Sequence, residues 1–300
     1  MFKVRVPAST ANLGAGYDIL GCALGLYNVF HFDESDAFQM TSDGPFGHET
    51  DFPMDQTNLV YKAFEHVCQA YQKQPPPLAI HLEINIPPSR GMGSSSTAIV
   101  AGLCAGYYWC HGVLDKDHIL SLAIELEGHP DNVAPALLGG CQVNYKTEQG
   151  SYITSRINVP ERLKWVLCYP DFQLSTKKAR QVVPEVLSQS DCVLNMGYLS
   201  ALLLGFTRDQ PDLISYGLKD RLHEPYREVL VPGMAAVRQG AIEAGALGCV
   251  LSGAGPSLLA LTLDNEFEIA EKMTSIWKQS GILSNFVIQP MDHQGASILY

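Results

Sequence analysis

The stretch LAIHLEINIPPSRGMGSSSTAIVAGLCA, residues 78–105, decides the fold of this 300-residue chain. Its first part alternates apolar and polar residues, which predicts a strand over residues 78–86. Pro87 and Pro88 end that strand because neither has an N–H to donate. Glycines and serines follow, and a helix-forming run covers residues 97–108. A strand, a glycine turn and a helix N-terminus predict a phosphate-binding site, because free backbone N–H groups point outward there.

The composition is that of a globular protein without a basic surface. Apolar residues make up 46% and charged residues 17%, and 300 residues form one or two domains with ample core. The formal net charge is −11, and no run of lysine or arginine occurs. Nucleic-acid binding needs a basic face, so a nucleic-acid partner is not expected.

Eight cysteines are scattered through apolar runs without a CxxC pair, so a zinc site is not expected. They indicate buried free thiols in a reducing cytoplasm, and the first ten residues lack the apolar core of a signal peptide. Residues 91–114 carry no charge and contain a GxxxG pattern, which also fits a membrane span. Because this stretch opens with serines and contains His111, a helix buried between a sheet and other helices fits better.

Strands and helices alternate in the first half, and a boundary near residues 158–161 divides the chain into domains 1–158 and 159–300. Further strands are predicted over residues 2–6, 24–33, 37–41, 139–145, 152–157, 165–169 and 286–289, with a strand, a glycine turn and a strand over 248–261. Further helices are predicted from 57 or 58 to 72, over 115–127, 133–138, 194–206, 233–244 and 267–279, and from 175.

Polar residues gather at two breaks in these elements. The loop of residues 7–18 presents Asn12 and Asp18 to a ligand, or is an ordinary turn with capping side chains. Residues 125–132 end a helix with Glu125, Glu127, His129, Asp131 and Asn132. Hard oxygen ligands suit Mg²⁺, whereas a solvated acidic helix end that caps the next helix is the alternative.

Two segments of the second half have anion-binding potential. Thr176 and Arg180 are four residues apart and share a helix face, and Arg180 can grip a phosphate or carboxylate with two N–H groups. Residues 221–227 form the second segment, which contains Arg227. In each case exposed charge beside a helix cap is the alternative.

Three glycine-rich loops, at residues 14–16, 91–93 and 253–255, lack the spacing of a dinucleotide fold and of a P-loop. The central one closely resembles the nucleotide-binding motif of the GHMP small-molecule kinases. Its residues are Pro88, Ser89, Arg90, Gly91, Met92, Gly93, Ser94, Ser95, Ser96, Thr97 and Ala98. Met92 and Thr97 stand where the family usually has leucine and alanine. Residues 7–18 resemble the family's first motif, and residues 251–257, with Gly253, its third.

Residues 127–135, 175–180 and 224–227 resemble the homoserine kinase branch of that family. Mevalonate kinases present an aspartate, proposed as general base, where this chain has Asn132. An asparagine cannot take a proton at neutral pH. The resemblance therefore implies a mechanism without a base from the protein, in which the γ-phosphate accepts the hydroxyl proton late.

The resemblance implies an α+β, two-domain GHMP kinase fold with the nucleotide in the cleft. The N-terminal domain would be ribosomal protein S5 domain 2-like and the C-terminal domain ferredoxin-like. It implies an enzyme of the cytoplasm that phosphorylates L-homoserine with ATP and Mg²⁺, on the route to threonine. The partners would be these small molecules without nucleic acid or membrane, and a homodimer is compatible with the pattern. Another small alcohol (mevalonate or a sugar) and a non-catalytic binding protein of the same fold are the alternatives.

The resemblance also implies roles for residues. Backbone N–H groups of residues 91–96 would cradle the β- and γ-phosphates, while a hydroxyl, best that of Ser95, and Glu125 or Glu127 would hold Mg²⁺. Arg180 and Arg227 suit the carboxylate of homoserine, and Asp18 suits its ammonium group. The residues that would surround homoserine are Asn12, Asp18, His129, Asn132, Thr176, Arg180 and Arg227. Of these, Asp18, Asn132, Thr176 and Arg180 would be the catalytic residues.

Overall fold

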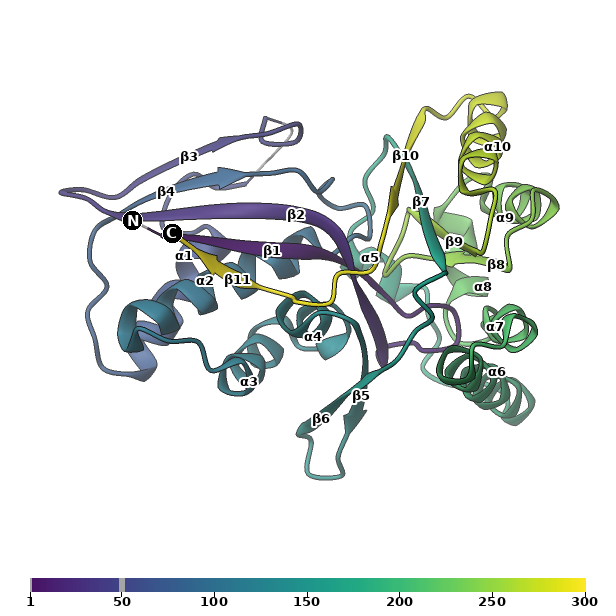
Figure 1. The fold of residues 1–300 in the computed structure, drawn as a ribbon, viewed down its shortest axis with the longest axis horizontal. Coiled ribbons are helices and arrows are strands. Elements are labelled where there is room, and N and C mark those ends of the chain that lie inside the picture. The colour runs from purple at the N-terminus through teal and green to yellow at the C-terminus, as the bar shows by residue number, and fades with distance from the viewer. Residues whose placement is uncertain (1, 49–51) are drawn as a thin grey trace.

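The structure is a computed structural model that describes residues 2–48 and 52–300. A seven-stranded sheet and a four-stranded sheet lie side by side, each with helices packed on it (Figure 1). Helices and strands are mixed rather than strictly alternating, as expected for an α+β protein.

The seven-stranded sheet contains the first four strands of the chain. Its strands are β1 (Phe2–Ala11), β2 (Leu20–Glu34), β3 (Gln39–Asp43), β4 (Leu78–Glu83), β5 (Cys141–Lys146), β6 (Tyr152–Ile157) and β11 (Ser297–Leu299). The associated helices are α1 (Leu59–Ala70), α2 (Ser94–His111), α3 (Lys116–Glu127) and α4 (Pro130–Leu138). These helices lie on one side of the sheet (Figure 1) and enclose an apolar core with it.

The four-stranded sheet has the antiparallel order β10-β7-β9-β8. Its strands are β7 (Lys164–Pro170), β8 (Gly248–Leu251), β9 (Leu258–Thr262) and β10 (Ser284–Gln289). The helices of this part are α5 (Thr176–Gln181), α6 (Gln189–Arg208), α7 (Pro211–Gly217), α8 (Glu224–Arg227), α9 (Met234–Glu243) and α10 (Glu266–Gln279), with a 3-10 turn, η1 (Glu228–Leu230).

The long helix after the glycine turn of residues 89–93 is buried, as predicted. Gly102 of α2 lies so close to α1 that an added Cβ would stand 2.2 Å from the carbonyl oxygen of Val60. In the described part of the chain, no helix combines the length and hydropathy that crossing a bilayer requires. All eight cysteines are free, and six of them are buried. The uncharged stretch therefore forms core.

Several predicted boundaries were wrong. β1 continues to Ala11 instead of ending at residue 6, with a register shift between Pro7 and Ala8. Residues 6–15 are buried throughout, so the alternation that marks a half-buried strand is missing there. α2 begins at Ser94 rather than Thr97, and α7 and β11 were not predicted.

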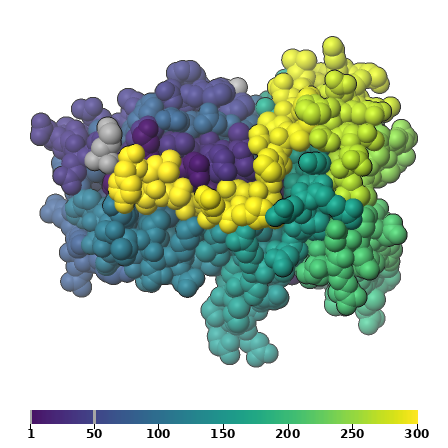
Figure 2. Space-filling view, viewed as in Figure 1, coloured from purple at the N-terminus to yellow at the C-terminus, as the bar shows by residue number. Residues whose placement is uncertain are grey.

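The C-terminal residues return to the first sheet. After β10 the chain crosses its surface as a narrow strip (Figure 2), and β11 pairs with β1. Along this strip Asp292 accepts hydrogen bonds from the Tyr27 hydroxyl and from two backbone N–H groups. The predicted division at residues 158 and 159 therefore leaves the last strand outside the sheet to which it belongs; the division itself remains a prediction.

Candidate active site

One cavity of about 240 Å³ lies between the two sheets. It is lined by the glycine turn before α2, the end of α3 and the start of α4, by α5, and by the loops at Asn12 and Gly253. Its lining residues are Asn12, Asp18, Ser89, Gly91, Met92, Gly93, Ser94, Ser95, Ser96, Glu127, His129, Asp131, Asn132, Leu174, Ser175, Thr176, Arg180, Arg227, Gly253, Ala254 and Gly255. The structure thus brings together most of the residues that the sequence predicted.

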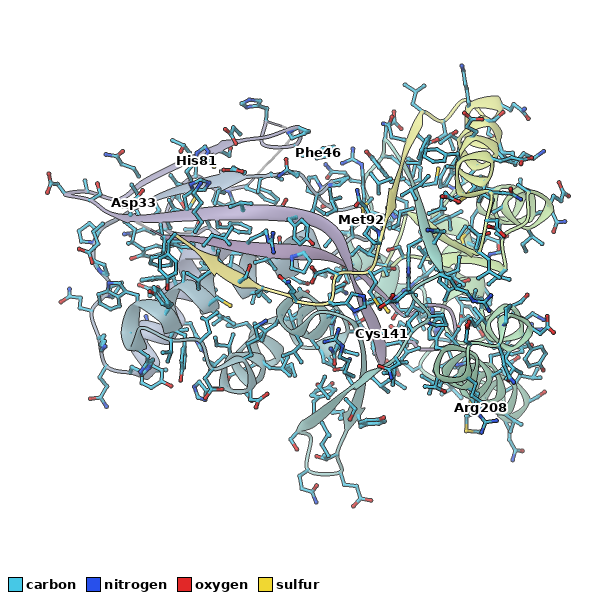
Figure 3. All side chains as sticks on the ribbon, viewed as in Figure 1. Asp33, Phe46, His81, Met92, Cys141 and Arg208 are labelled. Carbon is cyan, nitrogen blue, oxygen red and sulfur yellow. The ribbon has the colours of Figure 1, made fainter. Side chains whose placement is uncertain are left out.

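The turn before α2 is fixed from both sheets. Gly93 caps the helix in the left-handed region, with φ of +67°, and an added Cβ would stand 2.0 Å from the Ser9 hydroxyl. From the other side, the Ser252 hydroxyl donates to the carbonyl of Gly91 over 2.6 Å. Met92 is buried where the two parts of the molecule meet (Figure 3). This support leaves the N-terminus of α2 open to the cavity and suited to phosphate.

Four predicted nucleotide residues do not line this cavity: Pro88, Arg90, Thr97 and Ala98. Arg90 is buried and donates to the carbonyls of Pro170 and Asp171, so it ties the turn to β7. Thr97 is buried, and its hydroxyl donates a hydrogen bond to the carbonyl of Ser94. These side chains support the turn from behind.

A hydroxyl and a carboxylate meet beside this turn. The Ser96 hydroxyl donates to Glu127 Oε1 over 3.0 Å, whereas Ser95 is exposed at the cavity wall. Burial raises the pKa of Glu127, although His129 and Ser96 act in the opposite direction. Glu125 is exposed and does not line the cavity. The geometry therefore pairs Glu127 with Ser96, in place of the Ser95 that the sequence favoured.

His129 is held by the carboxylate of Asp131, which belongs to the same cluster of residues 125–132. Its Nδ1 atom lies 2.5 Å from Asp131 Oδ1, and Asp131 is only 3% exposed. Burial alone would lower the pKa of His129, but the hydrogen bond and the charge of Asp131 raise it above the usual value. His129 is thereby kept in one orientation at the cavity wall.

Two asparagines are oriented by hydrogen bonds. The Ser9 hydroxyl donates to Asn132 Oδ1 over 2.9 Å, which leaves the Asn132 amide N–H groups for other partners. Asn12 donates to the carbonyl of Gly253 over 2.8 Å and accepts from the backbone N–H of Asp18. Asn12 thereby joins the first and third glycine-rich loops.

Asp18, Thr176 and Arg180 share one wall of the cavity. Both terminal nitrogens of Arg180 donate to the Asp18 carboxylate, over 2.8 and 3.0 Å. This hydrogen bond raises the pKa of Arg180 despite burial. Thr176 is the first residue of α5, which is capped by Ser175. Asp18, which was predicted to bind the ammonium group of homoserine, and Arg180, which was predicted to bind its carboxylate, therefore form an ion pair with each other in this structure.

Arg227 lies deepest among the charged groups of the cavity, with 2% of its surface exposed. Burial lowers its pKa. A buried cation needs an anion or a full set of acceptors, and Arg227 donates to the carbonyls of Ala179 and Gly253 and to His223 Nδ1.

A second cavity, of about 210 Å³, shares Ser94 and Ser95 with the first. Its other walls are mostly apolar and include Phe30 and Ile84, with Asn28 and Asn58 as polar groups. Ala98, which the sequence predicted at the nucleotide, lines this cavity. The start of α2 therefore stands between a polar and an apolar cavity.

Ser9, Tyr17 and His223 contribute to the site without having been named from the sequence: the Tyr17 hydroxyl accepts from Arg180, and His223 accepts from Arg227. Ser9 lies within a strand, and its partner Asn132 is 123 residues away. Tyr17 could have been found from the sequence, because its neighbour Asp18 was already a candidate.

Two family models match this chain. The family model for the GHMP kinases N terminal domain matches residues 58–140, and that for GHMP kinases C terminal matches residues 201–279. The chain is 42% identical over 303 residues to a homoserine kinase of Microchaete diplosiphon, covering 99% of this chain and 96% of that one. It is 40% identical over 300 residues to a homoserine kinase of Desulfitobacterium hafniense, covering both chains completely.

A solved structure agrees. The crystal structure of homoserine kinase from Cytophaga hutchinsonii superposes with a TM-score of 0.88 at 28% identity, covering 99% of this chain and 97% of that one. The two-domain α+β fold expected from the sequence is therefore confirmed. The chain belongs to the GHMP kinase family, among the relatives that are homoserine kinases.

Proposed function

We propose that this protein transfers the γ-phosphoryl group of ATP to the side-chain hydroxyl of L-homoserine, forming O-phospho-L-homoserine on the route to threonine. One observation carries the proposal. A single cavity has a helix N-terminus for phosphate on one wall and Asp18, Arg180 and Arg227 on another. A small zwitterion with a hydroxyl group matches both walls at once.

The nucleotide fits the two adjoining cavities. The apolar cavity beside Ser94 and Ser95 suits the base of the nucleotide. Apolar walls can contact both faces of a flat ring, while a few polar groups fix its orientation. The phosphates would then reach the N-terminus of α2, where backbone N–H groups and the helix dipole favour negative charge.

The charged side chains suit the two ends of the amino acid. Arg180 and Arg227 would bind the carboxylate, and Asp18 the ammonium group. In the structure Arg180 and Asp18 neutralise each other. Homoserine would replace this ion pair with two new ones, so neither charge is left without a partner.

Transfer needs positioning and charge stabilisation more than covalent help. The amide of Asn132, oriented by Ser9, would hold the substrate hydroxyl. The hydroxyl oxygen forms the new bond to phosphorus while the bond to the ADP oxygen breaks. Its proton passes to an oxygen of the transferred phosphoryl group. Asn132 cannot accept that proton, which supports a mechanism without a base from the protein.

The residues present fit Mg²⁺. Ser96 and Glu127 supply hard oxygens next to the phosphate-binding turn. In the described part of the chain, no group of three or more His, Cys, Asp or Glu could hold a metal ion. When bound, Mg²⁺ would neutralise phosphate charge. Ser96 and Glu127 would hold it.

A coupled assay of ADP release tests the proposal against other alcohols. Purified protein with ATP and Mg²⁺ is offered L-homoserine, mevalonate or galactose. We expect turnover with homoserine and at least 100-fold lower kcat/KM with the others, because they lack the paired ammonium and carboxylate. Absence of homoserine turnover would contradict the proposal.

All eight cysteines are free, so we also propose a reducing cytoplasm as the location. A homodimer stays a prediction.

A further inference from the structure

We propose that Tyr17 is a positioning residue, whose phenol holds Arg180 and Arg227 together as one clamp for the substrate carboxylate. This inference rests on the proposed function, and it concerns a residue outside the cavity lining. Three observations carry it: the acceptors of Arg227, the position of the Tyr17 hydroxyl, and the support behind the Tyr17 ring.

Arg227 has mostly neutral backbone and ring acceptors. Its Nε–H donates to the carbonyl of Ala179 over 3.0 Å, and Nη1 donates to His223 Nδ1 over 3.1 Å and to the carbonyl of Gly253 over 3.2 Å. Within residues 2–48 and 52–300 it forms no ion pair. A buried guanidinium whose charge is not neutralised is arranged for an anion that arrives from outside.

The Tyr17 hydroxyl lies between the two guanidinium groups. It accepts from Arg180 Nη1 over 3.2 Å and from Arg227 Nη2 over 3.5 Å. Its ring also faces both cations, with the guanidinium carbons 5.7 and 5.1 Å from the centroid. Two positive groups repel each other, so a shared acceptor and a shared aromatic ring stabilise a spacing that they would not otherwise keep.

The Tyr17 ring is fixed from behind. It stacks on His223, with 4.9 Å between ring centroids, and His223 is completely buried. His223 Nε2 donates to the carbonyl of Gly14, and its Nδ1 is the acceptor for Arg227. Burial also raises the pKa of Tyr17, so the hydroxyl stays neutral while it accepts from both guanidinium groups. Tyr17 thus transmits the position of one arginine to the other.

The test compares Tyr17→Phe with wild-type protein on two substrates. L-Homoserine carries the carboxylate, whereas 3-amino-1-propanol keeps the ammonium and hydroxyl groups and lacks it. Tyr108→Phe is the matched control, because it removes an exposed hydroxyl whose partner is Tyr300. Tyr17→Leu, which also removes the ring, is the second variant. Thermal melting of each variant accompanies the kinetics.

We expect Tyr17→Phe to raise KM for homoserine about tenfold, with kcat and KM for ATP changed less than twofold, and Tyr17→Leu to raise it further. With 3-amino-1-propanol, Tyr17→Phe and wild type should have equal kcat/KM. An unchanged KM for homoserine, or equal losses on both substrates, would overturn the clamp. If wild-type protein does not phosphorylate homoserine, the proposed function fails instead, so the two failures are distinguishable.

Discussion

At the scale of single residues, the structure separates side chains that the sequence left equivalent. Glu125 and Glu127 both end α3, and no pattern in the chain favours one. Only Glu127 reaches the cavity, where Ser96 donates to it, because the helix turns adjacent side chains about 100° apart per residue. Glu125 therefore faces solvent, whereas Glu127, two residues later, faces the cavity.

We therefore predict unequal effects for the two glutamates. Glu127→Gln should raise the Mg²⁺ concentration for half-maximal activity at least tenfold, because the amide carries no charge for the ion. Glu125→Gln, the matched control, should leave it unchanged. Initial rates over a magnesium titration at saturating ATP and homoserine measure both. Equal responses of the two variants would contradict the assignment.

Ser9 and Asn132 show what sequence reasoning could not reach at this scale. Asn132 stood in a recognised motif, so its presence in the site could be predicted. The hydroxyl that orients its amide comes from a strand 123 residues earlier, through a contact that only tertiary structure creates. The same holds for Tyr17 and His223, whose partners lie on distant segments.

At the scale of elements, the strand, glycine turn and helix were predictable because the signals were local. Alternating apolar residues, two prolines and two glycines mark β4 and the start of α2. β1 was predicted too short because its second half is buried on both faces and crosses a bulge at Pro7. Alternation of apolar and polar residues marks a strand that has one exposed face, so it does not identify a strand that is buried on both faces.

The two glycines that cap α2 provide a test at this scale. Gly93 and Gly112 both lie in the left-handed region, with φ of +67° and +72°. An alanine at Gly112 would meet nothing within 4 Å, whereas at Gly93 its Cβ would clash with Ser9. Gly112→Ala should lower stability by about 1 kcal/mol and leave KM for ATP unchanged.

Gly93→Ala should carry the same backbone strain and also raise KM for ATP more than tenfold, since the turn at the helix N-terminus must shift. Steady-state kinetics with varied ATP and urea unfolding of both variants give the comparison. If the two variants have the same KM for ATP, the phosphates do not bind at this turn.

At the scale of the whole molecule, buried thiols make stability depend on pH. Burial raises the pKa of Cys104 from 9.0 to about 12. The folded protein therefore keeps this proton to higher pH than the unfolded chain does. Its contribution is constant below pH 9, and the free energy of unfolding falls as pH rises toward 12, by up to about 1.4 kcal/mol per pH unit.

Urea unfolding of wild type and Cys104→Ala between pH 8 and pH 11 (about one unit below to two above the ordinary thiol value) tests this effect. The free energy of unfolding of the variant should fall less steeply with pH than that of wild type, and the difference between the two slopes is the contribution of the Cys104 thiol. Parallel slopes would show that Cys104 is not protected in the folded state.

The two-sheet architecture could be expected from the family motifs, but the return of the C-terminal residues to the first sheet could not. β11 has three residues, too few to show a period. Its pairing with β1 joins positions almost 300 residues apart, such as Lys3 and Leu299. Long-range closure of this kind leaves no local signal.

The central claim is that one cavity directs the γ-phosphoryl group to the hydroxyl of homoserine while the arginines hold its carboxylate. Phosphorus NMR of the products, with ATP, Mg²⁺ and L-homoserine, tests this claim most directly. We predict a phosphate monoester resonance coupled to the CH₂ protons of homoserine, with one equivalent of ADP. Inorganic phosphate alone, or an acyl phosphate on the carboxylate, would contradict it.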